Sequence, residues 1–430
     1  MSVNKNQMNI LIISHERSLN KTKSIINSLH KKHNLSLVVE QEIKNSKNYT
    51  SSCNQIIIAP NYDLNVIKKK LSKCDKIICV SENLLPLQHL LEVFYSIENL
   101  SKKAGDILSN KFELHKFCLS NQLGNYRPTT IIPNDEKSFS LLNGPIIIKP
   151  DIGTGSNKFL PPELTNIEYK VWSNTTSLMN YLNLKGLKKT FFELNKKSIK
   201  TKRFNYKPCR MMAQEYINPS SAVYAPCGIF RKGKANVSFY LKTELVFTQV
   251  NSSFGEVGNS EVISIPPDEV PQDIVNHSKH YINTLLTQLN VKELFFAGPD
   301  FYPLSNKFYA IDFNPRLGHF FNLIDQANNG LLFEDTWNGK ITRDYLQALW
   351  KVVNLNKNTI TNTKWIELYS KYIPAEAGSF KLGDKLPRQP TLQSKPRSIQ
   401  LLVSGQNSEY LYSKFNMIQS DIKFELEKKI

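Results

Sequence analysis

The segment from Leu294 to Arg316 constrains this chain most, because it carries two carboxylates among residues that favour strands. Side chains alternate between the faces of a strand, so Asp312 and Asn314 should share one face. With a turn at Ser305-Asn306, Asp300 falls opposite Asp312 within about one residue, and cross-strand neighbours have Cβ atoms roughly 5 Å apart. The sequence therefore predicts a β-hairpin that gathers two carboxylates and an amide oxygen.

Oxygen ligands of this kind suit a hard cation, and Mg²⁺ with nucleotide phosphates is the usual case. Arg316 lies two residues beyond Asn314 on the same predicted face, where a guanidinium could hold a transferring phosphoryl group or an oxyanion. The alternative is a half-exposed hairpin whose polar side chains meet water. Aromatic flanks favour burial, and buried carboxylates need cations or hydrogen-bond donors.

A strand that ends in a lysine forms the second polar segment. Ile146 to Ile148 precede Lys149, and a short turn follows. The residues of this turn are Gly153, Thr154, Gly155 and Ser156. The lysine can neutralise phosphate oxygens, while the glycines would let backbone N–H groups approach them closely. No Gly-Lys-Ser/Thr sequence follows, so this is not a Walker A motif, and an ordinary strand-to-loop turn is the alternative.

The third segment, Gln214-Glu215-Tyr216-Ile217, closes an apolar strand that starts at Met211. Its polar pair could offer side-chain and backbone groups to the edge of an adenine. Taken alone, this segment does not distinguish a nucleotide site from an ordinary strand end. The order and spacing of all three segments carry the interpretation.

Together these segments resemble the ATP-grasp superfamily across residues 100–330. In such enzymes a helix lysine, here in Ser109-Asn110-Lys111, precedes a strand-end lysine like Lys149 and a glycine loop. The last hairpin then supplies an acid, a second acid and Asn-Pro-Arg, here Asp312 to Arg316. The resemblance implies an ATP-grasp fold, in which two α+β subdomains grip ATP. A small parallel α/β domain would precede it, and a small β-rich element would follow.

The resemblance also implies a role for each matching residue. The ATP contacts would be Lys111, Lys149, Gly153, Thr154, Gly155, Ser156, Gln214, Glu215 and Ile217. The ligands of two Mg²⁺ ions, with Mn²⁺ as an alternative, would be Asp300, Asp312 and Asn314. The catalytic residues would be Lys149 and Arg316, and the substrate contacts would be Glu256, Arg316 and His319.

Several positions depart from the pattern of the superfamily. Asp312 replaces the commoner Glu, and Gln214 stands where an acid is frequent. Residues 218–224 offer no acid for a ribose. The stretch from Phe254 to Asn259 resembles the E-x-G-H segment of amino-acid and dipeptide ligases in this superfamily, but Asn259 replaces the His. These departures leave activity, nucleotide choice and metal stoichiometry open.

The flanks of the chain suggest a division into three parts. Residues 9–98 alternate strand-like and helix-like segments, which predicts a parallel α/β unit. The tail around Glu376 to Phe380 is similar to the C-terminal β-rich element of the ligases. The predicted domains are 1–100, 101–335 and 336–430. The predicted helices include Ser18–His33, Asp63–Leu71, Leu84–Leu100, most of 101–135, Asp273–Leu289 and a helix near Tyr345–Val353.

The chain is strongly basic, with 55 Lys and Arg against 37 Asp and Glu and a net charge of +18. A polyanion partner is one explanation. The lysines are scattered, which favours solvated surface charge instead. The densest basic stretch, Lys196 to Arg210, is the best nucleic-acid candidate, although nucleic acid is not the expected partner.

The six cysteines form no Cys-x-x-Cys pair, so free thiols in a reducing compartment are expected rather than a zinc site. The N-terminus has no long apolar segment, and no run approaches the length of a membrane span. A cytoplasmic protein without a membrane partner is therefore expected.

The expected activity is ATP-dependent ligation of a carboxylate to an amine, with an amino acid or peptide as substrate, through an acyl-phosphate. A homodimer is among the expectations. Three alternatives stay open at this point. They are a carboxylase acting through carboxyphosphate, a catalytically decayed ATP-binding scaffold, and a basic nucleic-acid-binding protein.

Overall fold

The fold is described from a computed structural model of the 430-residue chain. It describes residues 7–14, 19–41, 52–152, 162–197, 199–200, 208–219, 221–305, 307–318, 321, 324–325, 328, 331–339, 345–354, 369–372 and 398–427. None of the helices in these ranges is both long and apolar enough to cross a bilayer.

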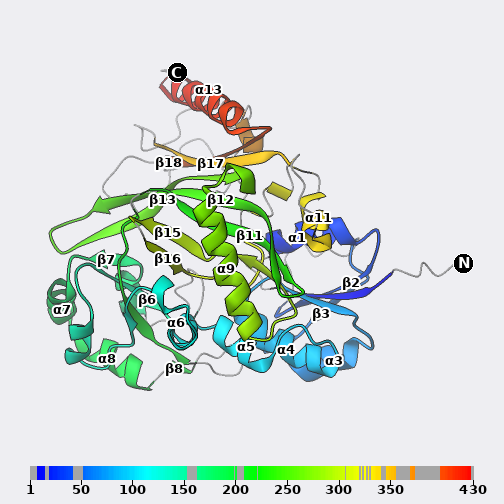
Figure 1. Cartoon of the computed structure of the whole chain (residues 1–430), viewed down its shortest axis with the longest axis horizontal. Helices are drawn as coiled ribbons and strands as arrows, with labels where there is room; N and C mark the ends of the chain where they lie inside the picture. Colours follow the sequence, from blue (N-terminus) through cyan, green and yellow to red (C-terminus); the bar gives the residue numbers. More distant parts are fainter. Residues whose placement is uncertain are drawn as a thin grey trace, which may run out of the picture.

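The chain opens with a parallel sheet of four strands in the order β3-β2-β1-β4. The strands are β1 (Asn9–Ile13), β2 (Asn34–Val39), β3 (Gln55–Ile58) and β4 (Lys76–Cys79). The helices of this unit are α1 (Leu19–Leu29), α3 (Leu64–Lys70) and α4 (Leu85–Phe94). Ile10 to Ile13 are all buried, as expected for a parallel strand covered on both faces. The parallel α/β unit predicted from the sequence is confirmed (Figure 1).

A second, antiparallel sheet of twelve strands forms the body of the molecule. Its main path runs β16-β15-β11-β12-β13-β7-β6-β10-β5, with β14 beside β11 and with β17 and β18 joined through β13. The first strands are β5 (Thr130–Ile131), β6 (Ile146–Pro150), β7 (Lys170–Trp172), β10 (Met211–Glu215), β11 (Val223–Arg231) and β12 (Lys234–Gln249). The others are β13 (Phe254–Ile265), β14 (Glu293–Ala297), β15 (Asp300–Leu304), β16 (Lys307–Ile311), β17 (Gln347–Asn354) and β18 (Ser398–Gly405). A separate pair is formed by β8 (Ile199–Lys200) and β9 (Pro208–Cys209).

One long helix, α9 (Gln272–Gln288), lies across strands β11, β12 and β15 of this sheet (Figure 1). Its apolar residues Ile274, Tyr281 and Leu285 are buried in the core, which the 3.6-residue period of the segment predicts. Phe301 of β15 packs edge-on against Tyr281. The helix thus covers one face of the acid-bearing hairpin and leaves the opposite face for the site.

The smaller half of the sheet, β5, β6, β7 and β10, carries its own core of aromatic and aliphatic side chains. Helices α7 (Thr175–Leu184) and α8 (Lys188–Lys197) lie beside it at the lower left of Figure 1. Trp172, Phe191 and Met211 are fully buried there. Strand β7 pairs with β13, so this half is continuous with the rest of the sheet.

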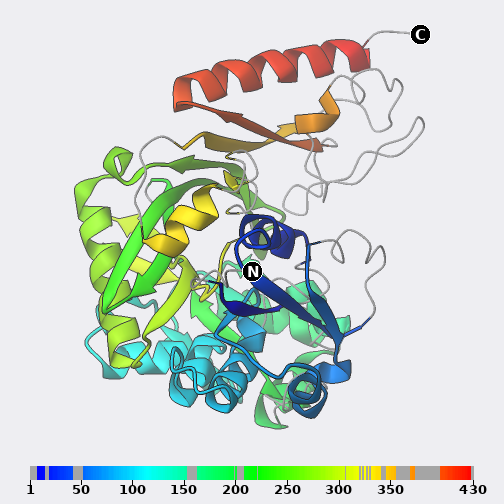
Figure 2. The same ribbon diagram turned by 90° about the vertical axis from the view of Figure 1, so that its right-hand side faces the viewer.

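The segment predicted to be helical near Tyr345–Val353 is strand β17 instead, and that prediction is wrong. β17 pairs with β13 on one side and with β18 on the other, so long-range pairing overrides the local helical pattern. Helix α13 (Ser408–Glu427) packs on β17 and β18 at the top of Figure 2. The tail around Glu376 lies outside the described residues.

Two other predicted helices are shorter than expected. The helix predicted over Leu84–Leu100 ends at Phe94, and Ser96 has a φ of 58°, which a continuing right-handed helix cannot accommodate. The region 101–135 forms two helices, α5 (Lys102–Leu108) and α6 (Lys111–Ser120), rather than one continuous stretch. Asn110 caps α6, since its side-chain oxygen accepts from the N–H groups of Phe112 and Glu113. The predicted domain divisions at residues 100 and 335 stay predictions.

Candidate nucleotide and metal site

The predicted acid hairpin is formed by β15 and β16, with Leu304 opposite Lys307 across the turn. Asp300 pairs with Ile311, so Asp312 lies one residue beyond the position opposite Asp300. Phe301 points into the core. Asp300, as the neighbour of Phe301 in the strand, therefore points to the other face.

The chain changes direction at Asp312, which has a φ of 51° and ends the regular strand. Asn314 rejoins the sheet by an isolated bridge to Ala297, with N–O distances of 2.9 and 3.1 Å. The alternation of faces predicted for Asp312 and Asn314 therefore does not describe this turn. Their contact is local, since Asn314 Nδ2 donates to the carbonyl of Asp312 at 3.0 Å.

Lys149 reaches the acid hairpin from β6, where it occupies the end of the strand as expected. Its Nζ lies 3.2 Å from Asp312 Oδ2, and its side chain is only 6% exposed. The Asp312 side chain is 30% exposed and so remains within reach of a ligand. The site thus pairs a buried ammonium with an accessible carboxylate.

The pKa values of the two carboxylates of the hairpin are shifted in opposite directions. Burial and the negative charge of Asp312 raise the pKa of Asp300 to about 7. For Asp312, burial alone would raise the pKa, but the ammonium groups of Lys149 and Lys111 outweigh it and lower the pKa to about 2. Two carboxylates close enough to repel each other attract a cation.

Lys111 is the first residue of α6, and a hydrogen-bond network ties this helix start to the end of β6. The Lys111 N–H donates to the carbonyl of Asp151 at 2.8 Å. The Asp151 carboxylate, fully buried, accepts from Asn110 at 3.2 Å and from the Arg210 guanidinium at 3.0 Å. Tyr169 and Asp312 raise the pKa of Lys111 above its usual value, although burial opposes this. The structure therefore brings Lys111 and Lys149 to one acidic patch.

At the strand end that was predicted to contact adenine, the polar side chains of Gln214 and Glu215 are hydrogen-bonded to other protein groups. Gln214 Nε2 donates to Thr130 Oγ1 at 2.9 Å, and Gln214 is 1% exposed. Glu215 Oε1 accepts from the N–H of Asn143 at 3.1 Å. Ile217 is buried beside this strand end. An adenine would therefore meet backbone and apolar groups here rather than a free Gln214 amide.

Five of the other predicted residues cannot be compared with the site. The glycine turn from Gly153 to Ser156 and His319 lie outside the described residues. Glu256 lies within strand β13, where it pairs with Lys170 of β7. Its role as a substrate contact stays a prediction.

Arg316 is held from three directions. Its Nε donates to Glu82 Oε2 at 3.2 Å, Nη1 to the carbonyl of Leu317 at 3.1 Å, and Nη2 to Asn314 Oδ1 at 3.3 Å. Glu82 lies 234 positions earlier in the chain, and nothing in its local sequence signals this contact.

Sequence reasoning also missed two buried groups beside the predicted ones. Arg127 is 8% exposed, and its Nη1 donates to the carbonyl of Ala310, two residues before Asp312, at 2.6 Å. Glu168 is 8% exposed, and neither of its carboxylate oxygens has a hydrogen-bond partner among the described residues. Burial raises the pKa of Glu168, and the charge of Lys111 opposes this rise. An Ile-Glu-Tyr sequence carries no signal for a buried acid.

The donor set at the hairpin fits Mg²⁺, because two carboxylates and an amide oxygen are hard ligands. In the part of the chain that the structure describes, no three His, Cys, Asp or Glu side chains gather as a metal-binding group. A soft-metal site is therefore not offered by the described residues, whereas an ion shared with phosphate oxygens would need only the few ligands of the hairpin.

Comparison with solved structures gives the fold class. No family model and no curated protein sequence matches the chain. An L-amino acid ligase from Bacillus licheniformis matches with a TM-score of 0.61 at 11% identity, over 98% of each chain. An N5-carboxyaminoimidazole synthetase from Staphylococcus aureus complexed with ADP matches with a TM-score of 0.58 at 15% identity, over 96% of this chain and 97% of that one.

A third similar structure is an N5-carboxyaminoimidazole synthase from Aspergillus clavatus, in complex with ADP and 5-aminoimidazole ribonucleotide. Its TM-score is 0.59 at 10% identity, over 96% of this chain and 98% of that one. These proteins are ATP-grasp ligases. The chain therefore has the ATP-grasp fold along nearly its whole length, and the fold predicted from the sequence is confirmed.

Proposed function

We propose that this protein is an ATP- and Mg²⁺-dependent ligase that joins a carboxylate to an amine through an acyl-phosphate and releases ADP and phosphate. The observation that carries the proposal is the meeting of Asp300, Asp312 and Lys149 at the end of one hairpin. This arrangement supplies neighbouring acids for a cation and an ammonium for phosphate oxygens.

ATP would lie between the two halves of the large sheet, with its phosphates at the acidic patch. Lys111 and Lys149 would neutralise α- and β-phosphate oxygens, and the turn from Gly153 to Ser156 would cover the γ-phosphate. Mg²⁺, held by Asp300, Asp312 and Asn314, would shield the phosphate charge and orient the γ-phosphoryl group. Gln214, Glu215 and Ile217 would border the base mainly through backbone and apolar groups.

The reaction would proceed in two steps. A carboxylate oxygen of the first substrate attacks the γ-phosphorus, the bond between that phosphorus and the bridging oxygen breaks, and ADP leaves. The amine of the second substrate then attacks the acyl carbon, phosphate leaves, and the amine loses a proton to solvent. Positioning and charge neutralisation dominate such transfers, so the residues need no covalent chemistry of their own.

Arg316 would stabilise the oxyanion of both steps. Three of its nitrogen atoms already donate to protein oxygens, which fixes the plane of the guanidinium. A donor fixed before the reaction stabilises developing charge without a reorganisation cost. Glu256 and His319 are candidate contacts for the substrates.

A carboxylase that activates bicarbonate as carboxyphosphate is the second candidate. The likeness to N5-carboxyaminoimidazole synthetases favours it, since those proteins share the fold over a similar length. In that case bicarbonate would take the place of the organic carboxylate. The same residues would then hold ATP and stabilise the oxyanion.

Phosphate release from ATP by the purified protein with Mg²⁺ tests the proposal. Pooled amino acids and small carboxylic acids are one arm, and bicarbonate with 5-aminoimidazole ribonucleotide is the other. Stimulated release with a product mass equal to both substrates minus water supports the ligase, whereas stimulation only by bicarbonate supports the carboxylase. ATP binding without stimulated release in any arm supports a decayed scaffold, and absence of ATP binding contradicts the proposal.

A further inference from the structure

One ion pair joins the N-terminal parallel sheet to the acid hairpin at the candidate site. Arg316 Nε lies 3.2 Å from Glu82 Oε2, and the two side chains are 10% and 9% exposed. The residues are 234 positions apart in the chain. A buried ion pair costs much desolvation and by itself argues little for stability, which directs attention to what it holds in place.

Glu82 stands at a defined place in the parallel sheet. It is the first residue of a 3₁₀ turn (Glu82–Leu84) that follows the carboxyl end of β4. Ligands of open α/β sheets are bound beyond the carboxyl ends of their strands. A side chain at this position is therefore well placed to contact the site of a neighbouring domain.

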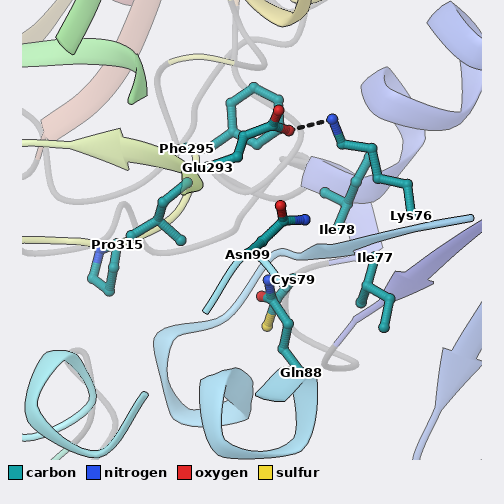
Figure 3. A pocket seen from close by; sticks show the side chains of 10 residues that line it. Lys76, Ile77, Ile78, Cys79, Gln88, Asn99, Glu293, Phe295 and Pro315 are labelled. Carbon is teal, nitrogen blue, oxygen red and sulfur yellow. Dashed lines mark ion pairs between the residues drawn. The ribbon is translucent and has the colours of Figure 1, made fainter. Parts of the chain in front are cut away.

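The interface next to the ion pair is incompletely filled. A small cavity lies between β4 and β14, and Figure 3 shows Cys79 and Pro315 at its wall. Lys76 and Glu293 form a second ion pair across the same cavity (Figure 3). The two ion pairs lie beside an apolar cluster in which Ile78 and Val80 pack with Leu317 of the body, so charged and apolar contacts together fix how the chain around Pro315 meets β4.

The three hydrogen bonds of Arg316 do not use all of its N–H groups. A guanidinium has five N–H groups, of which Nε carries one and each Nη carries two. One N–H on each of the three nitrogens already donates to Glu82, Leu317 or Asn314. Among the described residues, one N–H on each Nη has no acceptor, and two N–H groups on one guanidinium can donate to two oxygens of a phosphoryl or carboxyl group.

We propose that Glu82 is a positioning residue that fixes Arg316 for the oxyanion of the reaction, so that the N-terminal domain contributes to the site of the ATP-grasp body. This inference rests on the proposed function. It assigns to Glu82 no contact with substrate. The charge of Glu82 also acts on Lys111, so the part of its effect that passes through Arg316 is isolated by a mutant cycle.

Replacement Glu82→Gln tests this by a mutant cycle with Arg316→Lys. We expect kcat to fall about 10- to 100-fold in Glu82→Gln, the range for loss of a charge-assisted hydrogen bond. The melting temperature should also fall, because Arg316 loses the buried charge that pairs with it, so kcat is measured at a temperature where both proteins are folded. In the Arg316→Lys background, the same change should cost less than about 3-fold, because the group it positions is already lost.

Glu334→Gln is the matched control, since Glu334, whose side chain is 36% exposed, also pairs with the N-terminal unit, but through Lys32 and not through a residue of the candidate site. It should leave kcat unchanged. Equal losses from Glu82→Gln in both backgrounds, or no loss in either, would overturn the inference while leaving the ligase proposal intact.

If the wild-type protein shows no turnover, the proposed function fails and a binding measurement takes the place of kcat. The probe is then orthovanadate in the presence of ADP and Mg²⁺. Vanadate affinity should fall about 10-fold in Glu82→Gln but not when Arg316→Lys is already present. Equal vanadate affinity in wild type and Glu82→Gln would reject the inference.

Discussion

At the scale of single residues, the site is built from opposite charges that hold one another in place. Lys149 contacts Asp312, and Lys111 adds a second positive charge to the same patch. The pKa of Asp300 rises to about 7 because burial and the neighbouring Asp312 disfavour its charge. A divalent cation would therefore stabilise the ionised form of Asp300, which burial and the charge of Asp312 now disfavour.

Asp300→Asn separates the role of Asp300 in turnover from its role in folding. Loss of a metal ligand removes several kcal/mol of transition-state stabilisation, so turnover should fall at least about 100-fold. The fold should persist with an equal or higher melting temperature, because one of two neighbouring negative charges is removed. Asp268→Asn, the same change at an exposed 3₁₀ turn, serves as the control. Turnover at the wild-type rate in folded Asp300→Asn would remove the metal assignment.

Glu92 predicts a pH dependence of stability that belongs to the N-terminal unit. Burial raises its pKa from 4.5 to about 7, although Gln88 and the Leu100 N–H donate to its oxygens. The folded state therefore holds the proton more tightly than the unfolded state. Its contribution to stability is present below pH 4.5 and is lost as the pH rises through 7. The change amounts to on the order of 3 kcal/mol.

Urea unfolding of wild type and Glu92→Gln at pH 5 and pH 8 measures this effect, because other titrating groups cancel in the comparison. The stability of wild type relative to the variant should drop by about 2–3 kcal/mol between the two pH values. Parallel pH profiles for both proteins would show that Glu92 does not titrate in this range.

At the scale of elements, the acid hairpin depends on its neighbouring strands. β11 pairs with β14 at Cys227 and Ala297, and the Gly298 N–H donates to the carbonyl of Pro226 at 2.7 Å. A β-bulge sits between Cys227 and Gly228, where β11 meets β12. The position of Asp300 is therefore set by a strand that carries none of the site residues.

Gly228→Ala should destabilise the pairing of β11 with β12 at this bulge. A Cβ at this position would lie 2.0 Å from the carbonyl oxygen of Asn236, which belongs to the backbone and cannot turn away. We expect a loss of at least about 2 kcal/mol in unfolding free energy, measured by urea denaturation. Gly105→Ala in helix α5 is the matched control, since its nearest atom would lie at 3.4 Å and alanine favours a helix. Equal stability of the two variants would contradict the close approach at the bulge.

The elements also show what could be predicted from the sequence. The hairpin over residues 300–311 was predictable with its turn and register, because both strands and the turn lie within a few residues of each other. The strand at Gln347–Asn354 was not, since its partners β13 and β18 are distant in sequence. Asp312 was placed on an ideal strand, whereas its φ of 51° appears only in the folded turn.

The same distinction applies to the candidate site. Lys149, Asp300 and Asp312 were predictable because their motifs are local and chemically distinctive, and Lys149 and Asp312 do meet. Glu82 could not be found this way, since only the packing of two domains brings it to Arg316. Arg127 likewise acts across a long separation, through the carbonyl of Ala310.

At the scale of the whole molecule, a parallel sheet and a large antiparallel sheet meet at the candidate site. The parallel unit and the body are joined by ion pairs, Glu82 with Arg316, Lys76 with Glu293 and Lys32 with Glu334. The C-terminal strands β17 and β18 extend the large sheet from β13 (Figure 2). Residues from distant parts of the chain therefore contribute to one site, and the positions of the two sheets fix its geometry.

The transfer of oxygen from the carboxylate to phosphate tests the central claim most directly. When an active substrate pair is supplied with ¹⁸O in the carboxylate, attack on the γ-phosphorus and later loss of phosphate should move one labelled oxygen into the released phosphate. Mass spectrometry of that phosphate, with ADP as the nucleotide product, would establish the acyl-phosphate route. Unlabelled phosphate, or AMP and pyrophosphate as products, would contradict it.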